Sequence, residues 1–116
     1  MSVIKCQGWW EQAAYGRQEM HDLQLSMHNG VISGSGTDII HDFTLAGKIS
    51  EHGAVEIVKQ YRDRHSVLYV GRYDGEGAMF GDWHISGFTG KWWLKFQGPA
   101  SMALDDMAID EVLPQN

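Results

Sequence analysis

Lys59 is the residue whose type and position raise the clearest chemical question. It alternates with Val55, Ile57 and Tyr61 along one segment, so it faces the same way as apolar side chains. An ammonium group that faces a protein interior is costly unless it is hydrated, paired or neutralised. Lys59 is therefore either a polar anchor at the floor of a ligand cavity, with a lowered pKa, or a structural side chain near a rim, bonded to Tyr61 or to a loop carbonyl.

Aromatic residues are the second component of a candidate binding site. Pairing the neighbouring segments through their turns places Tyr69 beside Lys59. Trp83 and Trp92 then lie close enough to the ammonium group for cation–π contact. We predict that these side chains hold an apolar or aromatic small molecule. The full predicted set is Lys59, Tyr61, Tyr69, Trp83, Trp92 and Trp10.

Other chemical motifs are weak or missing. The sequence has no nucleophile elbow, phosphate-binding loop, dinucleotide fingerprint or EF-hand loop. Asp82 and His84 share one strand face, but the histidines lack the spacing of a zinc site, so we expect no metal ion and no cofactor. Four further polar side chains fall in connections at one end of the predicted sheet: Asp38, His41, Asp63 and His65.

The elements that must position these residues are β-strands. Between residues 3 and 97 apolar residues alternate with period two, turn residues recur at short intervals, and proline is absent. No span is long enough for the crossover helices of a parallel sheet. The pattern predicts an all-β fold, an eight-stranded antiparallel up-and-down β-barrel. Its predicted strands cover residues 3–11, 17–27, 31–35, 43–49, 55–61, 67–73, 79–85 and 90–96.

The same alternation predicts two inward-facing layers. The first layer consists of Leu45, Lys59, Tyr69, Trp83 and Trp92. The second consists of Gly47, Ile57, Gly71, Gly81 and Leu94. Small residues beside large ones allow a tapering barrel either to fill its interior or to leave room for one ligand in its mouth.

Two sequence segments carry a resemblance to known barrels. The segment GWWEQ at residues 8–12 resembles the first strand of avidin-like and lipocalin-like (calycin-like) barrels, and the eight-strand meander resembles the avidin fold. The Asn, Ser, Thr and Asp side chains that hold biotin in the avidin family have no counterparts here, so the resemblance implies the fold and not biotin binding. The succession KQY, HSVLYVG and GDWHISG at residues 59–61, 65–71 and 81–87 is similar to small uncharacterised bacterial barrel domains.

Composition and charge limit the class of protein. The chain has 116 residues and one cysteine, which suits a single domain without a disulfide. With 9 Lys and Arg against 15 Asp and Glu, the net charge of −6 argues against binding to nucleic acid or to an anionic membrane. We expect no signal peptide and no membrane-spanning run, and therefore a cytoplasmic protein. We place a boundary near Gly98, between a barrel domain at residues 1–97 and an acidic tail or short amphipathic helix at residues 98–116.

The outward face of the central strands is also apolar. Contiguous exposed apolar surface usually marks an interface, so we expect either a homo-oligomer or a face covered by the tail. The expected contact residues are Leu68, Val70, Phe80 and Trp93.

Three functions follow from these observations. We favour a module that binds a small molecule in the barrel mouth. One alternative is an enzyme of the proton-transfer or cyclisation type, with Lys59 or His65 as base and a tyrosine as acid, although no catalytic residue is assigned. The other is a filled structural barrel that acts through a self-association surface.

Overall fold

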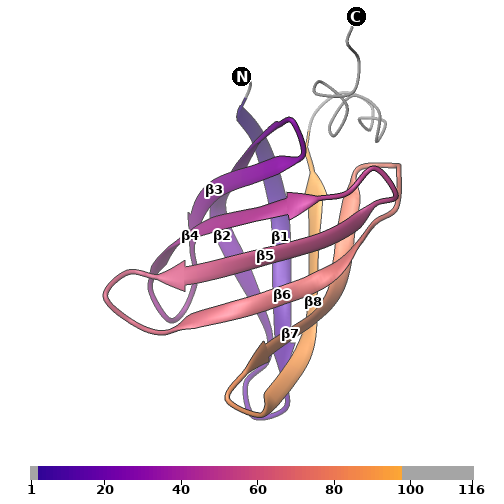
Figure 1. Cartoon of the computed structure of the whole chain (residues 1–116). Helices are drawn as coiled ribbons and strands as arrows, with labels where there is room; N and C mark the ends of the chain where they lie inside the picture. The colour runs from indigo at the N-terminus through magenta and orange to yellow at the C-terminus, as the bar shows by residue number, and fades with distance from the viewer. Residues whose placement is uncertain (1–2, 98–116) are drawn as a thin grey trace, which may run out of the picture.

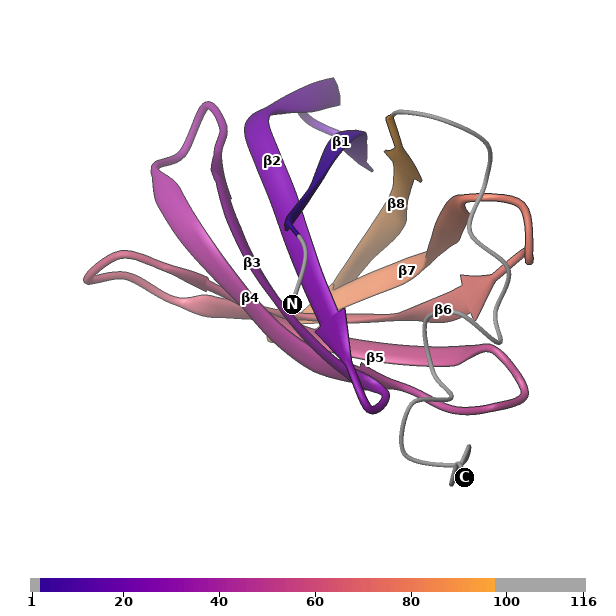
Figure 2. The same cartoon turned by 90° about the horizontal axis from the view of Figure 1, so that it is seen from above.

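Period-two alternation produces eight strands that close into one antiparallel barrel. The structure is a computed structural model that describes residues 3–97. Each strand pairs with the next and β8 pairs with β1, so the predicted all-β, up-and-down barrel is confirmed (Figures 1 and 2). The strands are β1 (Val3–Gln12), β2 (Gly16–His28), β3 (Val31–Thr37), β4 (Asp42–Ile49), β5 (Ala54–Tyr61), β6 (Ser66–Tyr73), β7 (Ala78–Ile85) and β8 (Phe88–Phe96).

Residues 3–97 contain no helix that is long and apolar enough to cross a membrane. The predicted acidic tail at residues 98–116, and any helix in it, lie outside the described residues.

Alternating burial explains why these segments are strands. Along β5, exposed and buried residues alternate without interruption, and the buried set includes Lys59. The inward side chains form a single hydrophobic core inside the barrel. Asn29 and Gly30 both have positive φ, as a two-residue hairpin turn requires. Because each hairpin is short, every strand lies beside its sequence neighbour.

The register differs from the predicted layers at two hairpins. Lys59 lies opposite Val67, and Tyr69 lies opposite Ile57, so Lys59 and Tyr69 are diagonal neighbours rather than a direct pair. The cause is the β5–β6 connection, because the ladder starts at the pair formed by residues 60 and 66. The predicted layer that joined Lys59 directly to Tyr69 is therefore wrong in this detail.

The second difference lies between β7 and β8. Trp92 lies opposite Gly81, whereas the sequence interpretation placed it opposite Trp83. Ser86 and Gly87 both have positive φ and form a two-residue turn, so β8 begins earlier than expected. The Trp92 indole N–H donates to the carbonyl groups of Val70 and Asp82, at 3.2 Å each.

The two ends of the barrel differ in what their connections contribute. The start of β1 and the end of β8 lie at one end (Figure 1). The opposite end, called here the cavity end, is formed by the β1–β2, β3–β4, β5–β6 and β7–β8 connections. Trp83 Nε1 donates to the Glu11 carbonyl at 2.9 Å and so ties β7 to β1 near the cavity end.

Candidate ligand-binding site

A buried ion pair lies inside the barrel near the cavity end. Lys59 Nζ, from β5, lies 2.7 Å from Asp38 Oδ2, and Asp38 belongs to the connection between β3 and β4. The side chains of Lys59 and Asp38 are 1% and 0% exposed. A charge buried to this degree needs a partner and further hydrogen bonds to offset the loss of hydration.

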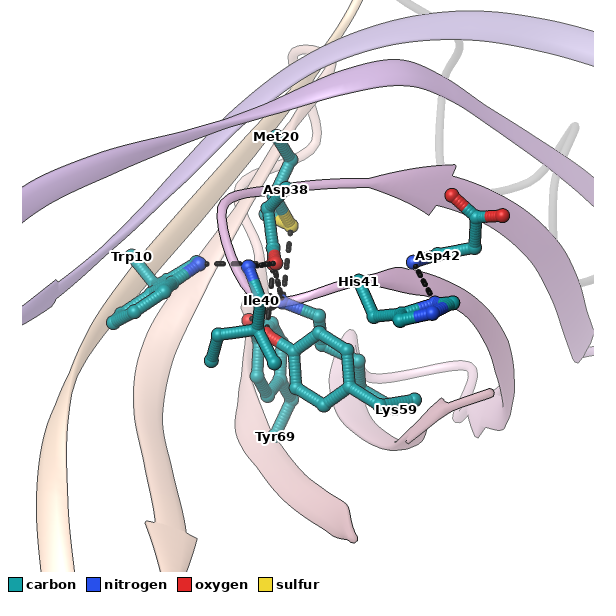
Figure 3. Close-up of polar contacts among 9 residues, drawn as sticks. Trp10, Met20, Asp38, Ile40, His41, Asp42, Lys59 and Tyr69 are labelled. Atoms are coloured by element: carbon teal, nitrogen blue, oxygen red, sulfur yellow. Dashed lines mark hydrogen bonds and ion pairs between the residues drawn. The ribbon is translucent and has the colours of Figure 1, made fainter. Parts of the chain in front are cut away.

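The carboxylate of Asp38 receives hydrogen bonds from four groups. Besides Lys59, the Tyr61 hydroxyl donates to Oδ2 at 2.7 Å and Trp10 Nε1 donates to Oδ2 at 3.1 Å. The Ile40 amide donates to Oδ1 at 2.9 Å within the same connection. Figure 3 shows Trp10 and Lys59 pointing toward Asp38 from β1 and β5, with Tyr69 of β6 beside Lys59. The connection is thereby fixed with its carboxylate pointing into the interior.

The ammonium group of Lys59 also has a hydrogen-bond partner for each of its N–H groups. It has three hydrogens, and three acceptors surround it: Asp38 Oδ2, the Tyr69 hydroxyl oxygen at 3.1 Å and Met20 Sδ at 3.7 Å. The Phe43 ring centroid lies 4.3 Å from Nζ, within cation–π distance. The described contacts therefore use all the hydrogen-bond donors of this buried cation.

Burial and pairing shift the pKa values in this cluster. Burial lowers the pKa of Lys59 from 10.5 to about 8, although the Asp38 charge opposes that shift. For Asp38, burial alone would raise the pKa, but the Lys59 charge and the hydrogen bonds it receives hold the pKa below 3.8. Burial and the Asp38 charge raise the pKa values of Tyr61 and Tyr69. At neutral pH both tyrosines are hydroxyl groups beside an ionised carboxylate.

A cavity of about 250 Å³ lies at the cavity end of the barrel. It is smaller than the roughly 300–1,000 Å³ of pockets for drug-sized ligands, so it suits a molecule of one or two rings. Its wall is mainly aromatic and aliphatic. The lining residues are Trp10, Gln12, Tyr15, Ile40, Tyr61, His65, Val67, Tyr69, Trp83, Ile85 and Phe88.

The cavity brings together four of the six predicted site residues. Trp10, Tyr61, Tyr69 and Trp83 line it. The other two predicted residues, Lys59 and Trp92, do not line the cavity. Lys59 is held behind the lining by Asp38 and Tyr69, and Trp92 lies deeper in the barrel, where its ring stacks on Tyr69 at a centroid distance of 4.9 Å.

Sequence reasoning missed Asp38 as the partner of Lys59. It placed Asp38 among loop residues, and the structure shows that the carboxylate turns inward instead. One signal was available, because an inward lysine requires a counter-charge and Asp38 follows the strand that ends at the same end of the barrel. Ile40, at the centre of the same connection, was also missed and lines the cavity.

Other reactive groups in residues 3–97 do not form a second chemical centre. No group of three or more His, Cys, Asp or Glu side chains in this range is arranged to hold a metal ion. Burial raises the pKa of the Cys6 thiol to about 12, so it is a poor nucleophile. A larger hollow of about 520 Å³ lies over β1 and β2, where Asp22 has positive φ and the strand pairing shifts. Its lining includes many outward polar side chains, and it contains no buried charged cluster.

No protein-family model, curated protein or solved structure matches this chain. The class that the structure shows is an eight-stranded up-and-down barrel with an aromatic cavity at one end, an architecture consistent with that of calycin-like barrels.

Proposed function

We propose that this protein binds one small, apolar or aromatic molecule in the cavity at the cavity end of the barrel. The observation that carries the proposal is the cavity of about 250 Å³, which is lined mainly by aromatic and aliphatic side chains. The Lys59–Asp38 ion pair lies behind this lining, and its hydrogen-bonding groups already have partners. Because both charged groups of this ion pair have all their partners, their side chains are held in place, and a rigid floor reduces the entropy lost on binding.

The aromatic wall supports this choice of ligand. Trp10 and Trp83 meet edge to face at a centroid distance of 6.4 Å, and their indole N–H groups are used by Asp38 and the Glu11 carbonyl. These two rings therefore present carbon surface to the cavity without a polar group that lacks a partner. Such a wall favours flat, apolar ligands.

A catalytic role has less support from the geometry. Lys59 and Asp38 are held by each other and by neighbouring donors and acceptors, so neither offers a free base. His65 lines the cavity, with its ring 5.0 Å from that of Tyr61, and it remains the base of the alternative proton-transfer enzyme. The hydrogen bonds that His65 accepts within residues 3–97 go to its backbone carbonyl, and none of them orients the imidazole.

A matched pair of neighbouring isoleucines tests the binding site. Ile40 lines the cavity, whereas Ile39 is 68% exposed and does not. Titration calorimetry with indane and naphthalene as probes should show binding to the wild type and to Ile39→Trp. Ile40→Trp fills the cavity and should weaken binding at least about tenfold. A wild type that binds neither probe, or an Ile40→Trp variant that binds as the wild type does, contradicts the proposal.

A further inference from the structure

We infer that the ligand is an uncharged ring compound with a carbonyl group, and that the Tyr69 hydroxyl donates the hydrogen bond that recognises this carbonyl. The inference rests on the proposed function, because it names the ligand class of the same cavity. Its basis is that nearly all buried polar groups at the cavity already have hydrogen-bond partners within the protein.

The cavity offers no free counter-charge for a charged ligand. The only buried charges among residues 3–97 are the ammonium of Lys59 and the carboxylate of Asp38, which neutralise each other at 2.7 Å. All three hydrogens of Lys59 already have acceptors, so none is left for an anion. A cation would face the same difficulty, since Asp38 already accepts four hydrogen bonds. A charged ligand would lose its hydration in this cavity without gaining a partner.

The buried side-chain donors at the cavity are also used, with one exception. Tyr61 and Trp10 donate to Asp38, and Trp83 donates to a backbone carbonyl. Tyr69 differs from them because its hydroxyl oxygen accepts from Lys59 while its hydrogen has no acceptor within residues 3–97. Tyr69 is 2% exposed, so bulk water does not readily supply that acceptor.

Lys59 makes the Tyr69 hydroxyl a stronger donor. An ammonium that donates to a hydroxyl oxygen withdraws electron density and polarises the O–H bond. Burial raises the pKa of Tyr69, so the group keeps its hydrogen at neutral pH. A polarised O–H group on a residue that lines an apolar cavity favours a carbonyl oxygen, which accepts hydrogen bonds well without carrying a charge.

Three probes of the same ring size separate the contributions to recognition: 1-indanone, indane and indane-2-carboxylate. The wild type should bind 1-indanone about tenfold more tightly than indane, and the carboxylate most weakly. Tyr69→Phe should reduce the ratio of 1-indanone affinity to indane affinity to about one, whatever the absolute affinity of that variant for indane. Tyr73→Phe is the matched control, because the Tyr73 hydroxyl accepts from the Gly77 amide at the opposite end of β6. That variant should keep the preference.

The infrared carbonyl stretch of 1-indanone gives a readout that does not depend on a folded variant. When 1-indanone binds to the wild type, a hydrogen bond from Tyr69 should lower the frequency of its carbonyl stretch below the value found in an alkane solvent. Equal binding of indane and 1-indanone, tighter binding of the carboxylate, or a carbonyl stretch as in alkane overturns the inference while the cavity still binds a ligand. Failure of all three probes to bind instead counts against the proposed function.

Discussion

Burying Asp38 and Lys59 removes two charges from water, and the surrounding hydrogen bonds must offset that cost. A buried pair of this kind seldom stabilises a fold more than apolar residues of equal size would. Its effect here is positional, because Asp38 draws the β3–β4 connection inward and orients Tyr61 and Trp10. Both of these aromatic residues line the cavity.

Removing one partner of the pair should therefore be costly. Lys59→Met keeps most of the volume but leaves the Asp38 carboxylate buried without a counter-charge, and it should lower the free energy of unfolding by about 3–5 kcal/mol. The double variant Lys59→Met with Asp38→Asn should be more stable than Lys59→Met alone, because no uncompensated charge remains. Urea denaturation measures the free energy of unfolding of the single and the double variant.

The control for this substitution is Lys48→Met on the neighbouring strand β4. Lys48 has a side chain that is 76% exposed and lies 3.9 Å from Glu56, so its loss should change stability by less than about 0.5 kcal/mol. If Lys59→Met is as stable as Lys48→Met, the pair does not have the structural role described above.

At this scale the sequence predicted one half of the pair. The period-two pattern of β5 shows that Lys59 faces inward, because its neighbours on that face are apolar. It says nothing of Asp38, which lies 21 residues away in a connection where the alternation stops. Whether such a connection folds into the barrel or away from it depends on the partners it meets there, and local spacing does not encode them.

At the scale of strands, a pair of glycines allows two backbones to approach closely beside Trp92. Gly71 of β6 and Gly81 of β7 lie directly opposite each other, and Trp92 of β8 lies opposite Gly81. The predicted layer of small residues is therefore present in part, but Trp92 occupies the space beside it. The hollow part of the barrel lies nearer the cavity end, beyond Tyr69.

A methyl group added at Gly81 should destabilise the barrel. A Cβ at Gly81 would overlap the Val70 carbonyl oxygen and the Gly71 Cα, which are backbone atoms that cannot rotate away. Gly81→Ala should cost about 3 kcal/mol or more. Gly36→Ala is the control, because its added methyl meets the side-chain ends of Phe43 and Leu23, and it should cost about 1 kcal/mol. Equal melting temperatures for the two variants would contradict this account of the glycine pair.

The strands themselves were predictable, and their register was less so. Every predicted strand overlaps an observed strand, with ends that agree to within two residues. Hairpin turns determine register, and the two-residue turn at Ser86 and Gly87 is tighter than the four-residue break expected from the sequence. Shortening the turn by two residues moves every cross-strand neighbour by two positions and keeps each side chain on its face, which is why Trp83 and Trp92 are not a direct pair.

At the scale of the whole molecule, the barrel has apolar side chains on its outside as well. The outward residues Val58 and Leu68 form a cross-strand pair and are 45% and 38% exposed. Phe80, which is 43% exposed, pairs with Trp93, and Trp93 stacks on Trp9 at a centroid distance of 5.9 Å. These side chains lie on the adjacent strands from β5 to β1, called here the outer face, where His84 of β7 lies opposite Leu68 and Arg72 of β6 lies opposite Phe80.

This outer face leads to a prediction about assembly. Contiguous exposed apolar surface on a small domain usually marks an interface, so we predict that the protein self-associates through Leu68, Val70, Phe80 and Trp93. Phe80→Glu places a charge on this face and should shift the protein to the monomer in sizing with light scattering. Ile39→Glu adds the same charge at a more exposed position in the β3–β4 connection, away from this face, and should leave the assembly unchanged. A wild type that is already monomeric at all concentrations tested would leave the face without a role in self-association, whereas dissociation by both variants would assign the contact to charge alone.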